Sequence, residues 1–351
     1  MRIELEDGTI LTGRSFGAQK NVEGEFVFNT GMIGYPETLT DPSYRGQILV
    51  LTYPLQGNYG VPRGPFEAPR VQVQGLLISR HSQAYSHHAA QRDLGEWLRS
   101  DGVPALDEVD TRGLTRLLRE HGTMRGRLVC DQDEHAPSES VDMAKVAELA
   151  AAREIKRYPA SGPSILVIDT GAKESIFLSL QRRGASVIRV PFFLPWKPLL
   201  QEAQGVLLTN GPGDPQDLGG LVQDLRGLLN GERPLFGICL GHQLLALAAG
   251  AKTYKLKYGH RSQNQPVMDL FTRRAYVTSQ NHGYAVDNTL PPDWEPSFVN
   301  LNDNTNEGMR HRHKSIFSVQ FHPEAAPGPH DTAYLFDDFL RTVGSNRRIE
   351  R

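Results

Sequence analysis

A short segment that joins an apolar run to a helical pattern constrains the fold of this chain more than any other feature. It reads Pro234-Leu-Phe-Gly-Ile-Cys-Leu-Gly-His-Gln243, and the character of the sequence changes at Cys239. Glycines stand at 237 and 241, where the backbone must turn sharply from strand into helix. Cys239 is therefore predicted to occupy a strand-to-helix elbow, the thiol counterpart of the G-x-S-x-G elbow. A thiol there faces the N-terminus of a helix, which favours the reactive thiolate.

A second segment supplies the groups that a cysteine nucleophile needs. Residues 315–321 alternate as a strand does, and His322-Pro-Glu324 follows at once. The proline biases His322 toward an extended backbone. In an extended segment residues i and i+2 project to one side, so we expect His322 and Glu324 to face the same site. Glu324 would then orient the imidazole that exchanges a proton with Cys239, which gives a Cys-His-Glu triad.

Two more segments converge on this chemistry. A predicted buried strand over 205–209 is followed by Asn210-Gly-Pro-Gly-Asp-Pro215. Its glycines let backbone N–H groups approach a ligand, and acyl transfer needs such donors where the tetrahedral oxyanion forms. One donor would come from Leu240 and the other from this turn. Alone, this segment and Thr278-Ser-Gln-Asn-His-Gly-Tyr-Ala-Val-Asp287 would indicate only turns.

Together the four motifs resemble the class I (triad-type) glutamine amidotransferases. That family releases ammonia from the glutamine side chain through a γ-glutamyl thioester. The resemblance implies that Cys239 is the nucleophile, His322 the acid and base, and Glu324 its orienter. It further implies oxyanion donors at Leu240 and Gly211. The residues that would hold L-glutamine are, by the same resemblance, Gly213, Gln243, Asn281, Gly283 and Tyr284.

The N-terminal half narrows the resemblance. Asp7-Gly8 between alternating runs predicts a hairpin, and Asp110 or Thr111 would cap an amphipathic helix over 110–120. Several phrases resemble the small-subunit family of carbamoyl phosphate synthetase, and the similarity extends across the whole chain. They are Phe28-Asn-Thr-Gly-Met-Ile-Gly-Tyr35, Thr40-Asp-Pro-Ser-Tyr44, Val109-Asp-Thr-Arg-Gly-Leu-Thr115 and Gly328-Pro-His-Asp331. The resemblance maps Ser43 onto a serine that touches the bound glutamine, which would make the pocket an inter-domain site.

The length of 351 residues favours two domains. We expect a β-rich α+β domain over 1–150, a linker over 151–163 and the glutamine amidotransferase domain over 164–351. In the last, strand and helix patterns alternate. This favours an α/β fold with an open, largely parallel sheet, helices on both faces and the elbow at the carboxyl ends of the strands.

Composition and missing motifs exclude several functions. A net charge of −2 favours neither nucleic acid nor an anionic membrane. Two cysteines in unrelated contexts suggest a reducing compartment, with Cys130 as a core residue, and neither a signal peptide nor an apolar run of ~20 residues is recognisable. We therefore expect a cytoplasmic protein. No phosphate-binding loop and no metal-ligand set is found, so we expect no cofactor or metal on this chain, with ATP and Mg on the large subunit.

The resemblance implies the glutaminase subunit of glutamine-dependent carbamoyl phosphate synthetase. Such a subunit hydrolyses L-glutamine to glutamate and ammonia. The ammonia passes to the large subunit of the heterodimer, which combines it with bicarbonate and ATP for arginine and pyrimidine synthesis. Three alternatives stay open at this point. They are the glutaminase subunit of another synthase (anthranilate or GMP type), a non-catalytic scaffold of the same fold, and a simple cysteine hydrolase.

Overall fold

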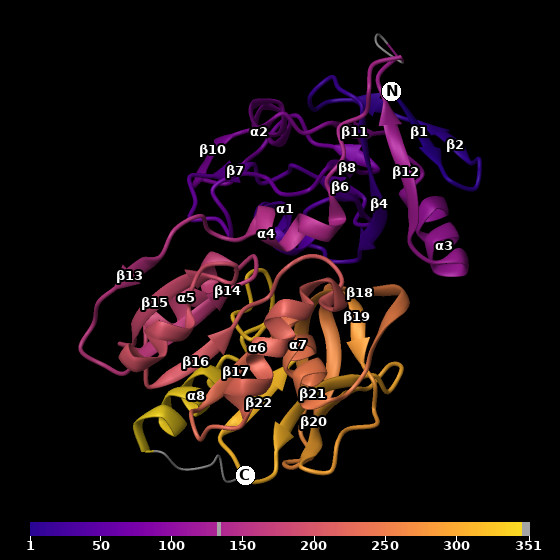
Figure 1. Ribbon diagram of the computed structural model, residues 1–351. Helices are drawn as coiled ribbons and strands as arrows, with labels where there is room; N and C mark the ends of the chain where they lie inside the picture. The colour runs from indigo at the N-terminus through magenta and orange to yellow at the C-terminus, as the bar shows by residue number, and fades with distance from the viewer. Residues whose placement is uncertain (132–134, 346–351) are drawn as a thin grey trace. The chain divides into compact units, whose positions relative to one another are not determined.

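The computed structural model describes residues 1–131 and 135–345 (Figure 1). The chain divides into two compact units, Met1–Met143 and Ala144–Arg351. Each unit has its own sheet and its own buried hydrophobic residues.

The first unit contains a mixed sheet in which the described strands follow the order β2-β1-β12-β4-β5-β8-β11-β3. The four strands β4, β5, β8 and β11 are mutually parallel, and the strands outside them pair antiparallel. The bounds of the sheet strands are β1 (Arg2–Leu5), β2 (Ile10–Thr12), β3 (Arg14–Ser15), β4 (Val22–Asn29), β5 (Gln47–Leu51), β8 (Gly75–Leu77), β11 (Ala105–Asp107) and β12 (Met124–Val129). The remaining elements are α1 (Tyr35–Thr40), η1 (Pro42–Tyr44), α2 (Leu94–Asp101), α3 (Thr111–His121), and the paired short strands β6 (Leu55–Gln56) with β9 (Arg80–His81) and β7 (Val61–Pro62) with β10 (Ala90–Arg92).

Two local predictions for this unit are confirmed. The turn between β1 and β2 carries Gly8 at φ 88°, a conformation that glycine adopts without strain. At α3 the cap is Asp110, whose Oδ1 accepts a hydrogen bond from the N–H of Gly113 at 2.8 Å. That contact satisfies one of the backbone donors that a helix start leaves without a partner.

The second unit is organised around one long sheet with the order β13-β15-β14-β16-β17-β22-β21-β19-β18-β20 over the described residues. Its strands are β13 (Lys156–Tyr158), β14 (Ser164–Asp169), β15 (Ser186–Pro191), β16 (Gly205–Leu208), β17 (Leu235–Ile238), β18 (Thr253–Asp269), β19 (Ala275–Val286), β20 (Trp294–Asn300), β21 (Asn306–His311) and β22 (Ile316–Val319). Its helices are α4 (Val146–Ala150), α5 (Glu174–Gln181), α6 (Gly219–Leu229), α7 (Leu240–Ala249) and α8 (Tyr334–Ser345), with the short helices η3 (Lys197–Glu202) and η4 (Pro215–Leu218). The short helix η2 (Met143–Lys145) lies across the unit boundary.

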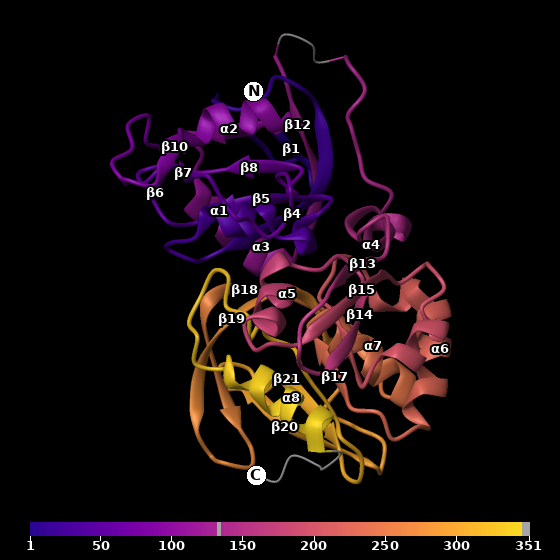
Figure 2. The same cartoon turned by 90° about the vertical axis from the view of Figure 1, so that its left-hand side faces the viewer.

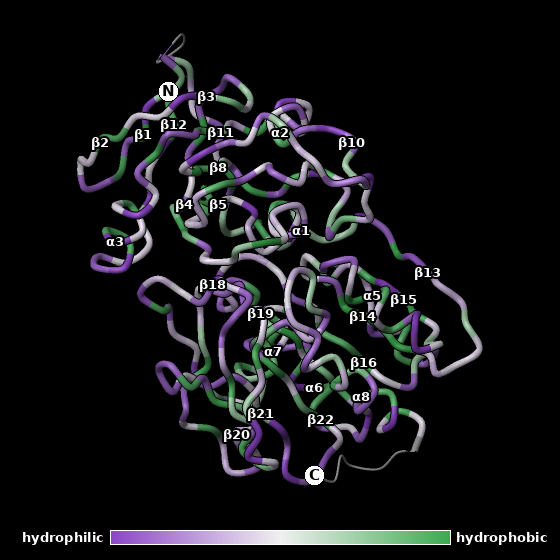
Figure 3. Tube along the Cα trace, turned by 180° about the vertical axis from the view of Figure 1, so that it is seen from behind, coloured by the Kyte–Doolittle hydropathy of each residue, from purple (hydrophilic) through white to green (hydrophobic). Residues whose placement is uncertain are grey.

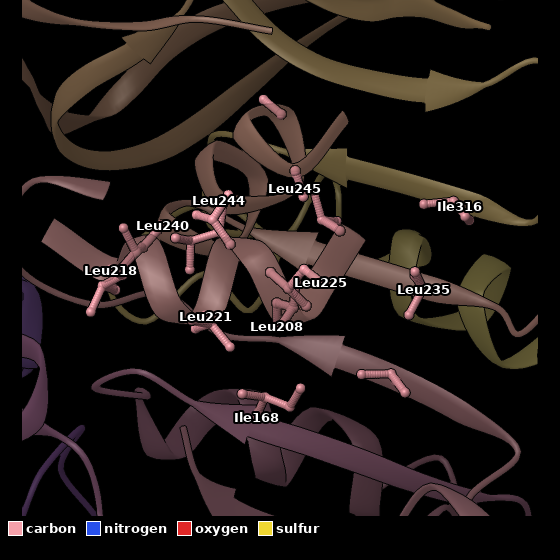
Figure 4. Close-up of a cluster of buried hydrophobic side chains, with 14 of the residues drawn as sticks. Ile168, Leu208, Leu218, Leu221, Leu225, Leu235, Leu240, Leu244, Leu245 and Ile316 are labelled. Carbon is pink, nitrogen blue, oxygen red and sulfur yellow. The ribbon is translucent and has the colours of Figure 1, made fainter. Parts of the chain in front are cut away.

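Alternate residues of the parallel strands enter two separate cores. Leu166 and Ile168 of β14 pack with the side of the sheet that α6 and α7 cover, whereas Ile165 and Val167 pack on the side of α5 and α8. Figure 2 shows α6 and α7 on one side of β17 and α8 on the other. Figure 4 shows Leu240, Leu244 and Leu245 of α7 meeting the strand residues of the first core. The predicted α/β fold with helices on both faces is confirmed, and burial on both faces explains why β14 is apolar at consecutive positions.

Two details differ from the expected architecture. The parallel arrangement covers β15, β14, β16, β17 and β22, whereas β21, β19, β18 and β20 pair antiparallel. The segment 151–163, which we expected to be a linker, includes β13, which pairs with β15 at the edge of the second sheet. Exposed polar residues are typical of edge strands as well as of linkers, so composition does not separate the two.

Candidate active site

The nucleophile elbow forms at the junction of β17 and α7. Cys239 has φ 55° and ψ −103°, a backbone conformation that residues other than glycine rarely adopt, and its side chain is buried. A Cβ on Gly241 would lie 2.4 Å from the carbonyl oxygen of Leu208, and one on Gly237 would lie 2.7 Å from that of Gly241. Both glycines are therefore required by close backbone approach. The sharp turn that we expected of them falls instead on Cys239, since neither glycine has a positive φ.

His322 lies three residues beyond the last residue of β22, and a backbone hydrogen bond joins Cys239 to that strand directly. The N–H of Cys239 donates to the carbonyl of Val319 at 2.8 Å, and the N–H of His322 donates to Ser279 of β19 at 2.9 Å. Residues 322–325 form a turn, closed by the N–H of Ala325 on the carbonyl of His322 at 3.2 Å. Our expectation of an extended His322–Glu324 segment was therefore wrong. The two side chains nevertheless meet, because the turn folds Glu324 back onto the ring.

The contacts of the His322 ring assign a role to each of its nitrogens. Nδ1 lies 2.6 Å from Oε1 of Glu324. Across the described part of the chain, Nε2 has no conventional hydrogen-bond partner. Burial alone lowers the pKa of His322, but the charges of Glu324 and Cys239 outweigh it and raise the pKa to about 10. Because Nδ1 is held by Glu324, Nε2 is the ring nitrogen left to interact with the sulfur of Cys239.

Lys173 completes the electrostatics of the triad. Its Nζ donates to Oε1 of Glu324 at 2.8 Å, and both side chains are almost wholly buried. Burial raises the pKa of Glu324, but Lys173 and the His322 imidazolium outweigh it and lower the pKa to about 2. The ionised groups thus alternate in sign from lysine to carboxylate to imidazolium.

Sequence reasoning missed Lys173. The lysine follows β14 at its carboxyl end, and its backbone N–H donates to Oδ1 of Asn210 at 3.0 Å. Its position after the carboxyl end of a parallel strand could have indicated a place near Cys239, because the carboxyl ends of neighbouring parallel strands meet at one edge of the sheet. The hydrogen bond also couples the lysine to the glycine turn that was predicted to hold an oxyanion donor.

His242, in the same motif as Cys239, is a second histidine to consider as the base. Burial lowers its pKa to about 3, so the ring stays neutral. Its Nδ1 lies 2.8 Å from the hydroxyl of Ser318. These contacts give His242 a structural role and leave His322 as the base.

The two predicted oxyanion donors are brought together. Gly211 lies so close to Thr170 and Leu240 that an added Cβ would meet the carbonyl oxygen of Thr170 at 2.2 Å and Cδ2 of Leu240 at 2.8 Å. Leu240 begins α7, where backbone N–H groups have no partner within the helix. Gly213 follows in the same turn at φ 96°. The glycine turn therefore places backbone without side chains beside the first residues of α7.

Four of the predicted glutamine-binding residues lie on β19 and α7. The sulfur of Cys239 lies 3.7 Å from the carbonyl oxygen of Asn281. The Nε2 of Gln243 donates to the carbonyl of Tyr284 at 2.8 Å and to Oε1 of Gln320 at 3.0 Å. Gly283 stands between Asn281 and Tyr284 on the same strand. These contacts place the motifs around one sulfur atom.

Ser43 belongs to the first unit, in the short helix η1. Its N–H donates to Oδ1 of Asp41 at 2.9 Å, which fixes the backbone of the Asp-Pro-Ser-Tyr segment. Its expected contact with glutamine stays a prediction.

The fold and the triad define a class I glutamine amidotransferase unit, and comparison with known proteins agrees. A family model described as "Glutamine amidotransferase class-I" matches residues 166–342. A second, described as "Carbamoyl-phosphate synthase small chain, CPSase domain", matches residues 3–128. The second match decides between the amidotransferases, because it covers the unit that precedes the triad.

Similar proteins match over nearly the whole chain. They include the carbamoyl phosphate synthase arginine-specific small chains of Neosartorya fischeri (48% identical, covering 97% of this chain and 79% of that protein), Yarrowia lipolytica (47%, 99% and 83%) and Neurospora crassa (46%, 99% and 81%). The chain therefore belongs to the carbamoyl phosphate synthase small-chain family and is the glutamine amidotransferase subunit of that enzyme. The resemblance drawn from the motifs is confirmed, and the anthranilate and GMP alternatives are set aside.

Membership of a small-chain family implies a large-subunit partner and glutamine as substrate. Among the helices of the described residues, none has both the length and the apolar character that crossing a bilayer requires.

Proposed function

We propose that Cys239, His322 and Glu324 hydrolyse L-glutamine through a thioester on Cys239. The thiolate attacks the carboxamide carbon, and the N–H groups of Leu240 and Gly211 receive the developing oxyanion. His322 then gives its proton to the amide nitrogen as the carbon–nitrogen bond breaks, which releases ammonia. A water then attacks the thioester carbon while His322 takes a proton from that water. The carbon–sulfur bond breaks, which regenerates the Cys239 thiolate and releases glutamate as the second product.

One observation carries this proposal. The Nδ1 of His322 is held 2.6 Å from a carboxylate, while Nε2 stays available for the sulfur. Glu324 is itself fixed by Lys173, so the ring is presented in one orientation. The raised pKa of His322 means that the resting ring already carries the proton that departing ammonia needs. These contacts also argue against a non-catalytic scaffold, which has no need of an ordered and charged triad.

Covalent trapping tests the nucleophile. The two cysteines of the chain provide a matched pair, because Cys130, like Cys239, is buried and forms no disulfide within the described residues. A diazoketone analogue of glutamine should add one label per chain, on the peptide that contains Cys239. Intact-mass and peptide spectra should show the same label in Cys130→Ser and none in Cys239→Ser. Labelling at Cys130, or of Cys239→Ser, contradicts the assignment.

We further propose that Gly213, Gln243, Asn281, Gly283 and Tyr284, with Ser43 from the first unit, bind the amino-acid part of glutamine. Support comes from the hydrogen bond between Gln243 and the carbonyl of Tyr284 and from the contact between the sulfur and Asn281. Ala substitution of Asn281 should raise the KM for glutamine more than it lowers kcat. An unchanged KM would remove Asn281 from this set.

The destination of the ammonia is also a proposal. We infer that this chain pairs with one large subunit, which binds ATP and Mg and uses the ammonia with bicarbonate to make carbamoyl phosphate. The similar proteins are named arginine-specific, which supports arginine synthesis as the use of the product. Pyrimidine synthesis and a cytoplasmic location stay predictions. Copurification of this chain with the synthase subunit, and glutamine-dependent synthesis by the pair, tests the partner.

A further inference from the structure

Three buried side chains outside the triad meet on neighbouring strands of the second unit. His260 lies on β18 and pairs in register with His282 on β19, and Glu307 lies on β21. One side-chain nitrogen or oxygen from each lies within 4.8 Å of the others. All three residues are buried, Glu307 completely. A desolvated carboxylate facing two imidazoles requires an explanation, because burying charge is costly unless it is paired.

Each histidine uses one ring nitrogen for orientation. His260 places Nε2 at 2.8 Å from Oδ2 of Asp303, and His282 places Nδ1 at 2.8 Å from the carbonyl oxygen of Tyr284. In the tautomers that donate from those two nitrogens, Nδ1 of His260 and Nε2 of His282 carry lone pairs. Nε2 of His282 also lies 3.1 Å from Oε1 of Gln280, an oxygen that a bound metal would share with it. Histidines that bind metals are held in this way, with the second N–H on a carboxylate or carbonyl.

The carboxylate of Glu307 is also oriented by a hydrogen bond. Oε1 of Glu307 accepts a hydrogen bond from Nδ2 of Asn300 at 3.0 Å. Its Oε2 and Nδ1 of His260 are both buried without a hydrogen-bond partner, as judged over residues 1–131 and 135–345. Nδ1 of His260 lies 3.5 Å from Oε1 of Glu307. That separation matches two ligands on one tetrahedral zinc ion, which stand roughly 3.4 Å apart when each bond is about 2.1 Å.

We propose that His260, His282 and Glu307 form a binding site for a divalent transition metal of the zinc class. Two imidazoles and one carboxylate are a ligand set that zinc uses in proteins. Two carboxylates, those of Asp303 and Glu307, lie within ion-pair distance of the His260 ring, and their negative charge favours a dication. The amide oxygen of Gln280, 3.1 Å from Nε2 of His282, or a water fills the fourth position. This proposal replaces the expectation of no metal site.

A metal at this site would take no part in the reaction, but it would lie next to residues of the proposed glutamine pocket. The carbonyl of Tyr284 accepts from His282 and also from Gln243 of the proposed glutamine pocket. A metal on His282 would therefore stiffen the strand that carries Asn281, Gly283 and Tyr284. This consequence rests on the proposed glutamine pocket, whereas metal binding itself does not.

Cobalt titration of the full chain, purified without a polyhistidine tag and stripped with a chelator, tests the site. We expect one Co²⁺ per chain, with the visible absorption of a tetrahedral ion, displaced by one equivalent of Zn²⁺. Asp303→Asn should weaken Co²⁺ binding about 10- to 100-fold, the usual effect of losing an orienting partner. Glu307→Gln should weaken it more. His313→Asn, at an exposed histidine outside the cluster, should bind as the wild type does.

The competing explanation is a proton shared between His260 and its two carboxylates. If that explanation holds, the wild-type chain takes up no stoichiometric Co²⁺, and the metal site is overturned. Binding that survives both Asp303→Asn and Glu307→Gln overturns it as well. Asp303 is partly exposed, so its variant should fold even if Glu307→Gln does not. Metal removal should raise the KM for glutamine with little change in kcat, and an unchanged KM would remove the link to the pocket while the titration still decides the site.

Discussion

The two halves of the second sheet bury different kinds of side chain. In the parallel half, β14 buries four consecutive apolar residues, Ile165 to Ile168. In the antiparallel half, β19 buries five consecutive polar residues, Thr278 to His282. Figure 3 shows the contrast, with hydrophobic colour along β14 and β16 and paler or hydrophilic colour along β18 and β19.

The difference follows from what covers each half. Helices on both faces surround the parallel strands with hydrocarbon, so those strands need only apolar side chains. Buried polar groups must find partners, and the antiparallel half supplies them from within, as Asn300 does for Glu307. The triad lies where the two halves of the sheet join. The backbone N–H of Cys239 donates a hydrogen bond to the carbonyl of Val319, and that of His322 donates to the carbonyl of Ser279. The parallel half thus fixes the position of the nucleophile, and the antiparallel half supplies polar groups that can bind a ligand.

The largest effect should come from the nucleophile. Cys239→Ser should lower glutamine-dependent synthesis by the assembled enzyme roughly 10⁴-fold or more, because triad members act as a unit. Synthesis from added ammonia should be kept, since it bypasses the sulfur. Rates with each nitrogen source, beside those of Cys130→Ser, give the answer. Equal loss with both sources would mean that the elbow is needed for assembly and not for chemistry.

The base and its orienter should differ in size of effect. His322→Ala should reduce glutaminase activity about 10- to 100-fold more than Glu324→Ala, since a base is less dispensable than the group that orients it. Glu324→Ala should also cost about 3–5 kcal/mol of unfolding free energy, because Lys173 is left buried without its carboxylate. Steady-state assays and urea unfolding of both variants measure the two effects. The reverse ranking in activity would exchange the assigned roles.

The charged triad should also shape the dependence of stability on pH. The pKa of Glu324 is lowered, so its contribution is complete above about 4.5 and is lost as the pH falls toward 2. The pKa of His322 is raised, so its contribution is complete below about 6.5 and is lost as the pH rises toward 10. The unfolding free energy should therefore be highest between these limits. In His322→Ala the loss on the alkaline side should be smaller, and an unchanged alkaline limb would argue against a protonated resting ring.

Sequence analysis succeeded where the chemistry is contiguous in the chain. Cys239 with its glycines, and His322 with Glu324, are each read from a few adjacent residues. Lys173 was missed because its partner lies 151 positions away, and no local pattern marks the pair. The His322 turn was mistaken for an extended segment, because a preceding-proline preference is local and weak whereas the turn is fixed by the bond from Ala325.

The two halves of the second sheet also differ in how clearly their strands are marked in the sequence. The alternating strand and helix patterns of residues 164–351 predicted the parallel strands, since burial on both faces leaves a clear apolar signal in a strand such as β14. The polar runs of β18 and β19 gave no such signal, because their burial depends on partners in other strands. For that reason the cluster of His260, His282 and Glu307 could not be found from spacing.

A substitution in the glycine turn should have a moderate effect confined to the site. Gly211→Ala would force its Cβ against the carbonyl of Thr170, so the turn must shift and move its N–H away from the oxyanion position. We expect kcat for glutamine to fall about 10- to 1000-fold, the range for loss of one oxyanion donor. Gly220→Ala is the matched control, because no atom lies within 4 Å of the added Cβ and the residue is in α6. If both variants behave alike, Gly211 has no special part in the reaction.

The smallest effects compare the two halves directly. Ile168→Val removes one methylene from the apolar half and should cost about 1 kcal/mol of unfolding free energy. Thr278→Val keeps the shape but removes a hydroxyl that donates to the carbonyl of Gln265 and accepts from Gln280. Its cost should be larger, about 1–3 kcal/mol, because buried polar groups lose their partner. Urea unfolding of both variants measures the difference in unfolding free energy. An equal or smaller cost for Thr278→Val would show that the antiparallel half tolerates the loss of hydrogen-bond partners and does not differ from the parallel half in this respect.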